Sequence, residues 1–580
     1  MDLTSLTSWH ADWRGLRVGV LGLGVTGFSV ADTLAELGAS VLVLAEKAPK
    51  AQAGLLGVIG AELYEGSLAE VPQQLVDLDP QLIVTSPGFH PDNAVLEWAA
   101  SNGIAVWGDI ELAWRVRDKV RAAEWITVTG TNGKTTTVQL ATHILAEAGH
   151  RVAAVGNIGL PVLDAVRDPI GFDVLVVELS SYQLHWINSS PEGAISALAS
   201  VCLNIDDDHL DWHGSAEAYR AAKGKVYDNT RVACIYNKSD EVTMHLVEEA
   251  DVIEGCRAIG FDLGIPGPSD VGMVDDIVVD RAFHDDRRNS ALELTTHGEL
   301  AAAGLAAPHS VANVLAASAL VRAFGVAPAV IRAAVATFTV DHHRTETVVT
   351  LDEVLWIDDS KATNAHAANA SLTAYGSVVW IAGGLLKGVD VSPLVEKHAP
   401  HLRAAVIIGV DRELLREAFQ RHAPGLPVFE VDETDTEEVM PAAVRLAGEA
   451  AQPGDVRSLL RPQHRWTSSP TMPTAVAGLL PPCSPPAQIP PRKTPIHRQR
   501  RGPNGHDEAA GTPDPGNDPA CAPRAVVTEV LDETRHRACR NHPAGAHYAS
   551  CASGCARVDR SRQTGGSRRR RAPHLRCRDR

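Results

Sequence analysis

The segment WITVTGTNGKTTTVQL, residues 125–140, contains groups that could hold the phosphates of a nucleotide. The apolar stretch Trp125–Val128 leads into a turn with glycines at positions 130 and 133, and a helical pattern begins near Lys134. Backbone N–H groups at a helix N-terminus bind phosphate, while a lysine and a hydroxyl reach the terminal phosphates and Mg²⁺. Because Val128 stands where G-x-x-x-x-G-K-[ST] has its first glycine, an ordinary glycine turn with an incidental lysine is the alternative.

Side chains that could hold a metal ion follow this loop. Glu178 ends the apolar pattern DVLVVE, and a carboxylate at the carboxyl end of a strand beside a phosphate loop suits Mg²⁺. Lys223 lies fourteen residues after His209. A dense polar run precedes it: Asp206, Asp207, Asp208, His209, Asp211 and His213. On these residues alone, a metal site and a solvated acidic loop are both open.

A second glycine pattern lies near the N-terminus. Gly22, Gly24 and Gly27 form G-x-G-x-x-G between an apolar strand and a helical pattern, and Glu46 ends the next strand. This pattern is typical of a dinucleotide site, in which the acid binds a ribose, but it also fits a tight strand-to-helix turn. Taken alone, it favours an NAD-dependent oxidoreductase.

A third polar string, IDDSKATN, directly follows an apolar strand, where sites form in α/β proteins. It supplies Asp359, Ser360, Lys361 and Thr363, and Arg344 lies shortly before it in HHRTE. Polar strand-to-helix loops are also common as helix caps, so this string is weak by itself.

These residues require three α/β units in series to position them. Residues 17–44 predict strand, glycine turn, helix and strand, and a further strand ends at 86–88. Strands near 151–155, 173–178 and 199–204 follow the phosphate loop, and VLWIDDS, SVVWIAGG and AAVIIGV predict the third unit. We expect a Rossmann-like domain at 1–120, a P-loop ATPase domain at 121–340 and a second Rossmann-like domain at 341–457.

Composition divides the chain near residue 457. The net charge is −18 overall, but residues 458–580 carry 21 Lys and Arg against 9 Asp and Glu. They hold 17 of the 35 prolines, six of the nine cysteines and no phenylalanine, so we expect a disordered tail. No signal peptide and no apolar span of ~18 residues are evident, which predicts a cytoplasmic protein without membrane or nucleic-acid partners.

Together, these motifs resemble the Mur ligase family, ATP-dependent enzymes that add amino acids to the peptidoglycan precursor. The short loop GTNGKTT is similar to that family's phosphate loop, which lacks the first glycine. DSKATN and GLGVTG resemble the members that join D-glutamate to UDP-N-acetylmuramoyl-L-alanine. The resemblance covers roughly residues 10–456 and implies an acyl-phosphate intermediate, two Mg²⁺ ions and a monomer.

The resemblance also assigns roles to individual residues. It implies that ATP phosphates contact Gly130, Thr131, Asn132, Gly133, Lys134, Thr135 and Thr136, and that Asn313, Arg344 and Asp359 contact the rest of the nucleotide. The implied metal ligands are Thr135, Glu178, His209 and Lys223, the last as a carbamate. Lys134, Asn157, His209, Lys223, Lys361 and Lys387 are the expected catalytic residues.

Substrate contacts are implied in the same way. The first glycine motif would serve a uridine diphosphate rather than NAD, with Val25, Thr26, Ser86, Pro87 and Gly88 around it. Ser181 and Gln183 would line the muramoyl side, and Thr363 and Lys387 would face D-glutamate. The sequence departs from the family pattern at Ala45, which replaces an acid, and at Ser310, which replaces an asparagine.

The tail is the largest departure. After Gly454-Asp455 the family continues with a strand and a segment similar to A-S-x-D-x-F, whereas this chain reads RSLLRPQHRWTSSP. The single codon of Trp466 and permitted codons around it allow a one-base shift that restores that segment. We therefore expect residues 458–580 to be read out of frame, which leaves a catalytically impaired relic of a ligase as one alternative.

Overall fold

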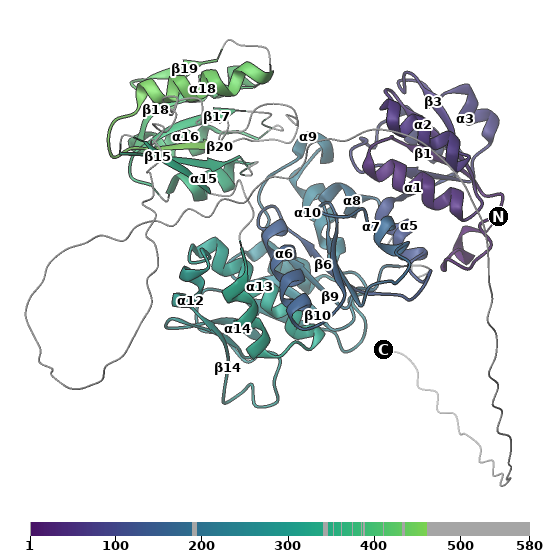
Figure 1. Ribbon diagram of the computed structural model, residues 1–580, viewed down its shortest axis with the longest axis horizontal. Coiled ribbons are helices and arrows are strands. Elements are labelled where there is room, and N and C mark those ends of the chain that lie inside the picture. The colour runs from purple at the N-terminus through teal and green to yellow at the C-terminus, as the bar shows by residue number, and fades with distance from the viewer. Residues whose placement is uncertain are drawn as a thin grey trace, which may run out of the picture. The chain divides into compact units, whose positions relative to one another are not determined.

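The computed structural model describes residues 2–187, 194–339, 346–351, 353–360, 362, 364–373, 375–383, 386, 389–409, 411–431 and 436–460 (Figure 1). Arg344, Lys361, Thr363, Lys387 and the predicted tail beyond residue 460 lie outside these residues. Within the described residues the strands form three sheets, so the predicted α/β class is confirmed. No described helix is both long enough and apolar enough to cross a bilayer.

The first sheet has the order β3-β2-β1-β4-β5 and is parallel throughout. Its inner strands β2, β1 and β4 are nearly continuous buried apolar runs, as is typical of a parallel sheet with helices on both faces, whereas the edge strand β3 has no buried residue. The order reverses beside β1, so the loops after β1 and β4 flank a crevice suited to a ligand. The elements are β1 (Arg17–Leu21), α1 (Val25–Glu36), β2 (Ser40–Ala45), α2 (Lys50–Ile59), β3 (Glu62–Glu65), α3 (Gln73–Leu78), β4 (Leu82–Thr85), α4 (Ala94–Ser101), β5 (Ala105–Gly108) and α5 (Asp109–Arg115).

The second sheet has the order β14-β13-β12-β11-β10-β9-β6-β8-β7, with antiparallel pairing only at β12-β13-β14. Helix α13, with Pro308 in its first turn and Gly325 as its C-cap, packs against α6 in the core. The elements up to β9 are β6 (Glu124–Thr129), α6 (Lys134–Glu147), β7 (Val152–Gly156), α7 (Val162–Val166), β8 (Val174–Glu178), α8 (Ser181–His185) and β9 (Ala199–Cys202). The remainder are α9 (Leu210–His213), α10 (Ala216–Gly224), β10 (Ala233–Asn237), α11 (Glu241–Glu248), β11 (Arg257–Phe261), β12 (Asp270–Val274), β13 (Ile277–Asp280), β14 (Leu292–Thr296), α12 (His297–Ala302), α13 (Pro308–Phe324) and α14 (Pro328–Thr337).

The third sheet has the order β15-β16-β20-β17-β18-β19. Strand β20 lies between β16 and β17, parallel to both, and runs three residues past the predicted domain boundary at 457. Asp455, just before it, accepts hydrogen bonds from Ser377 and Arg403 and fixes the start of the strand. The elements are β15 (Glu346–Leu351), β16 (Val354–Asp359), α15 (Ala365–Thr373), β17 (Val378–Gly383), α16 (Ser392–His398), β18 (Leu402–Ile408), α17 (Arg412–His422), β19 (Val428–Glu430), α18 (Thr436–Ala450) and β20 (Val456–Leu460).

Candidate active site

The glycine turn between β6 and α6 has the backbone that a phosphate loop needs. Gly130 and Gly133 have φ of +147° and +84°, a region that strongly favours glycine. A Cβ on Gly133 would lie 2.3 Å from Oδ1 of Asn313, so any other residue there would displace this side chain. No side chain caps α6, whose first residues include Thr135 and Thr136. Its N-terminal N–H groups are therefore available to an anion.

Lys134 lies along the loop. Its Nζ donates hydrogen bonds to the carbonyl oxygens of Gly130 at 2.8 Å and Thr131 at 2.9 Å. The side chain thus holds a positive charge beside the uncapped helix end. Such a charge stabilises a transferring phosphoryl group.

Neighbouring loops hold the phosphate loop in place. The amide N–H of Asn132 donates to Oδ1 of Asn204 at 2.8 Å, and Nδ2 of Asn204 donates to the carbonyl of Asn132 at 3.1 Å. The hydroxyl of Thr131 lies 2.9 Å from that of Tyr219. Apart from ordinary polarity, no sequence pattern indicates Asn204 or Tyr219, because their role depends on contacts between segments distant in the sequence.

Lys223 is buried beneath the same loop. It is 2% exposed, and its Nζ donates to the carbonyl of Gly130 at 2.9 Å and to Oγ1 of Thr129 at 3.2 Å. Burial, followed by the nearby charge of Lys134, lowers the pKa of Lys223 from its usual 10.5 to about 7. The charges of Asp208 and Glu178 act on it in the opposite direction, so these four groups share one neighbourhood.

Glu178 presents an oxygen that lacks a partner among the described residues. Its side chain is 1% exposed, Oε1 accepts a hydrogen bond from Nδ2 of Asn157 at 2.9 Å, and Oε2 is buried without a hydrogen bond. An unpaired buried carboxylate oxygen is costly unless a cation meets it. Asn157 also donates its backbone N–H to the carbonyl of Glu178 at 2.9 Å, which fixes both residues.

His209 is the N-cap residue of the short helix α9 and has φ of +55°. Its Nδ1 pairs with the hydroxyl of Tyr182, and its Nε2 lies 3.6 Å from Oδ2 of Asp208. Asp208 is buried, and sequence analysis named it only as part of an acidic run. Within the described ranges no three His, Cys, Asp or Glu side chains are grouped closely enough to hold a metal ion. A metal here would therefore need further oxygen ligands.

A cavity of about 890 Å³ opens beside the phosphate loop. Asn132, Gly133, Thr136, Asn313 and Asp359 line it, all of which the sequence assigned to the nucleotide. Sequence analysis missed several other lining residues: Asn237, Ser239, Asp240, His366 and Tyr375.

Loops of the second α/β unit contact residues at the start of α15 in the third unit, beside this cavity. Asn132 and Asn364 exchange side-chain hydrogen bonds at 2.9 and 3.3 Å. Nδ1 of His366 lies 2.9 Å from Oδ2 of Asp206, which raises the pKa of His366. The DSKATN string therefore meets the phosphate loop through Asn364, and His366, just after that string, meets the acidic run, although no sequence pattern predicts either pairing.

The first glycine motif forms a second cradle, between β1 and α1. A Cβ on Gly27 would lie 2.0 Å from the carbonyl oxygen of Gly22, so the turn requires glycine. Oγ of Ser86, after β4, is buried with no hydrogen bond among the described residues. Val25 and Thr26 open α1, whose N-cap Gly24 gives it no side-chain cap. The uncapped N-terminus of α1 and the hydroxyl of Ser86 thus offer hydrogen-bond donors to an anionic ligand. Pro87 and Gly88 follow Ser86 directly in the chain.

Ser181 and Gln183 are both buried at the start of α8. Gln183 completes a capping box with Ser180, and its Nε2 donates to Oδ2 of Asp109 at 3.1 Å. Burial raises the pKa of Asp109 to about 6. Gln183 is thus fixed by its neighbours, and Asp109 is a partner that sequence analysis missed.

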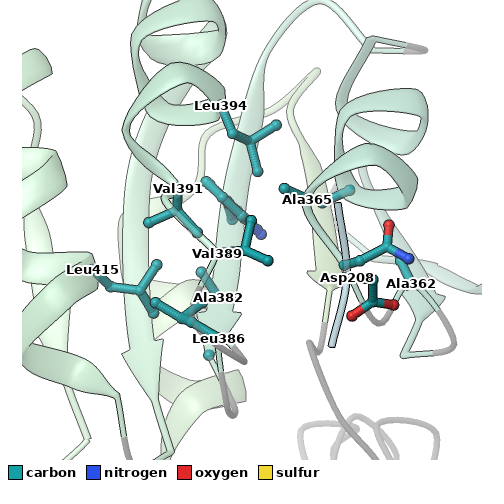
Figure 2. A pocket seen from close by; sticks show the side chains of 13 residues that line it. Asp208, Ala362, Ala365, Ala382, Leu386, Val389, Val391, Leu394 and Leu415 are labelled. Atoms are coloured by element: carbon teal, nitrogen blue, oxygen red, sulfur yellow. The ribbon is translucent and has the colours of Figure 1, made fainter. Parts of the chain in front are cut away.

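Figure 2 shows a small, mostly apolar pocket between α15, β17, α16 and α17. Leu386, Val389 and Leu394 face into it, and Asp208 lies at its edge near Ala362. The lysines and threonine assigned to this region, Lys361, Lys387 and Thr363, are outside the described residues.

Comparisons with known proteins agree on one family. The family model for the Mur ligase middle domain matches residues 128–321, and that for the Mur ligase MurD-like N-terminal domain matches residues 16–108. The UDP-N-acetylmuramoylalanine–D-glutamate ligase of Leifsonia xyli subsp. xyli is 64% identical over 461 residues, covering 78% of this chain and 89% of that protein. The ligase of the same name from Streptomyces avermitilis is 52% identical, covering 77% and 92%.

Proposed function

Because the chain belongs to the Mur ligase family, we infer that it is an ATP-dependent ligase that joins D-glutamate to UDP-N-acetylmuramoyl-L-alanine in peptidoglycan precursor synthesis. The observation that carries this conclusion is 64% identity across 89% of a ligase with this activity in its name. An intact phosphate-loop backbone between β6 and α6 supports it.

The reaction has two steps. A carboxylate oxygen of the alanine attacks the γ-phosphorus of ATP, the bond to the β-γ bridging oxygen breaks, and ADP leaves from the resulting acyl phosphate. The amine of D-glutamate then attacks the carbonyl carbon, the C–O bond to phosphate breaks, and an amide forms with loss of a proton. Lys134, beside the helix end, stabilises the charge on the transferring group.

ATP fits the cavity beside the phosphate loop. Residues 130–136 would bind its phosphates, Asn313 and Asp359 line the same space, and Arg344 would complete the contacts. The cavity has room for the whole nucleotide, since ligand sites of this class measure roughly 300–1,000 Å³.

The donor set fits Mg²⁺. The unpaired Oε2 of Glu178 and the hydroxyl of Thr135 would hold one ion, and His209 with a modified Lys223 would hold a second. Bound Mg²⁺ would offset the repulsion between the anionic nucleophile and the γ-phosphate. Since the described residues contain no cluster of three acidic, His or Cys groups, phosphate oxygens would supply the other ligands.

Lys223 suits carbamylation. A neutral amine adds to CO₂ and loses a proton to give an anionic carbamate, and the lowering of the pKa of Lys223 to about 7 leaves a large share of it as the neutral amine at neutral pH. The change would turn a buried lysine, whose charged form Lys134 disfavours, into an anionic oxygen ligand.

The UDP end would lie against the first cradle, at Val25, Thr26 and Ser86–Gly88, with the muramoyl group toward Asn157, Ser181 and Gln183. D-glutamate would approach from the third domain through Lys361, Thr363 and Lys387. The proposed domains are those expected from the sequence, at 1–120, 121–340 and 341–457.

One assay tests the function. Phosphate release from ATP should require both UDP-N-acetylmuramoyl-L-alanine and D-glutamate, and release that ignores either one contradicts it. A nucleotide-binding relic would show binding without release. Titrating the protein with a UDP-sugar and with NADH distinguishes the ligase from the oxidoreductase alternative. The ligase should bind the UDP-sugar at the first domain and should not bind NADH.

A further inference from the structure

Two cysteines of the second sheet lie side by side, away from the phosphate loop. Cys234 is in β10, Cys256 immediately precedes the neighbouring strand β11, and their sulfurs are 3.8 Å apart. Cys202 is the other cysteine among the described residues and belongs to β9. A disulfide needs the sulfurs to approach to about 2.05 Å, a movement that side-chain rotation and a small backbone shift can supply.

The two thiols are not equivalent. Cys234 is 2% exposed, whereas Cys256 is partly open to solvent. A hydrogen bond from the thiol of Cys234, supported by backbone N–H groups of Cys234 and Arg257, lowers the pKa of Cys256. The same thiol contact and burial raise the pKa of Cys234. Cys256 therefore has both the access and the thiolate character of an attacking group.

Burial makes Cys202 different. It raises the pKa of the Cys202 thiol to about 12, so this residue has neither exposure nor thiolate character. Because the pKa is raised for Cys202 but lowered for Cys256, the thiolate character of Cys256 comes from its own hydrogen bonds and not from its place in the sheet.

We propose that Cys234 and Cys256 form a reversible thiol–disulfide site, with Cys256 as the attacking thiol and Cys234 as the resolving thiol. The oxidant is a hydroperoxide. The Cys256 thiol loses its proton to solvent, the thiolate attacks the distal peroxide oxygen, an S–O bond forms, the O–O bond breaks, and the leaving alkoxide or hydroxide takes a proton from solvent to depart as alcohol or water. Cys234 sulfur then attacks the sulfenic sulfur of Cys256, the S–S bond forms, the S–O bond breaks, and water leaves with the Cys234 proton.

The disulfide would close a loop of chain that includes residues lining the nucleotide cavity. The 21 residues between the two cysteines include Asn237, Ser239 and Asp240, which line that cavity. Asp240 also accepts a hydrogen bond from the amide of Ile205 at 2.7 Å, which ties this segment to the loop after β9. Oxidation therefore restrains the segment at both ends. The site does not depend on the proposed ligase reaction.

Peptide mapping of the full chain tests the proposal. Trypsin cleaves after Arg231, Lys238 and Arg257, so Cys234 and Cys256 fall on the separate peptides 232–238 and 239–257. After hydrogen peroxide treatment, unfolding and alkylation, we expect these peptides to be linked and to have lost two hydrogens. Cys202 should be alkylated to the same extent as without peroxide, and dithiothreitol should separate the pair. Both cysteines remaining alkylated would overturn the proposal.

Two variants test the roles. In Cys234→Ser, a dimedone-type probe should label a persistent sulfenic acid at Cys256. In Cys256→Ser, Cys234 should remain unlabelled, as Cys202 does in both variants. Labelling of Cys234 in the second variant, equal to that of Cys256 in the first, would show that the assignment of the attacking thiol is wrong.

Discussion

Replacing Lys223 with methionine should stabilise the protein while it abolishes ligation. Lys223 is fully buried, and its pKa is lowered from 10.5 to about 7. At a pH between these two pKa values, Lys223 carries a proton in the unfolded chain but not in the folded chain. The free energy of unfolding therefore increases as the pH rises from about 7 to 10.5. At pH 7.5 the lysine therefore costs about 4 kcal/mol of stability.

Methionine removes that cost and is nearly isosteric. It also removes the hydrogen bonds from Lys223 to Gly130 and Thr129, each contributing about 1 kcal/mol. Lys223→Met should therefore be about 2 kcal/mol more stable than the parent at pH 7.5. The advantage should vanish near pH 9, where the cost of the lysine has fallen to about 2 kcal/mol.

The assay is urea unfolding of both proteins in CO₂-free buffer at several pH values, followed by their phosphate-release activity with and without bicarbonate. Bicarbonate should raise the activity of the parent and leave Lys223→Met inactive, and a short carboxylate should partly rescue Lys223→Ala. A stability difference independent of pH, or a variant that ligates D-glutamate at the parental rate, would refute the reasoning.

Three other changes separate the parts of the site. Lys134→Ala should remove phosphoryl transfer but leave UDP-sugar affinity within about twofold, since the cradles lie in different sheets; calorimetry showing equal loss of both would contradict this. Glu178→Gln, which can still accept the hydrogen bond from Asn157, should raise the Mg²⁺ needed for half-maximal activity by about 10–100-fold, and an unchanged Mg²⁺ titration would exclude Glu178 as a ligand. A one-base correction roughly between the codons for Asp455 and Arg465 should restore the A-S-x-D-x-F segment and raise the rate with D-glutamate; gene sequencing that finds no such correction would reject the reading-frame proposal.

Local patterns were sufficient for the fold class and for the backbone of the phosphate loop. Gly130 and Gly133 follow an apolar strand and precede a helix, and short-range sterics alone determine that arrangement. The spacing of Gly22, Gly24 and Gly27 also indicated the cradle after β1. The structure explains this spacing, because a Cβ on Gly27 would clash with the carbonyl oxygen of Gly22.

Long-range contacts could not be predicted in this way. Nothing in the sequence near Lys223 shows that Thr129 and Gly130 cover it, and its lowered pKa depends on that burial. The same limit applies to Asn132 with Asn364, whose side chains meet across 232 positions of sequence. Such pairs follow from sheet order and domain packing, which periodicity does not encode.

The position of β20 has a consequence for how the third sheet is assembled during synthesis. This strand lies between β16 and β17 but follows β16 by almost a hundred residues. When β16 to β19 have left the ribosome, the sheet still lacks the strand that joins β16 to β17, and the edges of both remain open. Closing so long a loop is slow, and exposed strand edges favour association with other chains. Nascent chains that pause before Val456 should therefore be the ones that most need a chaperone.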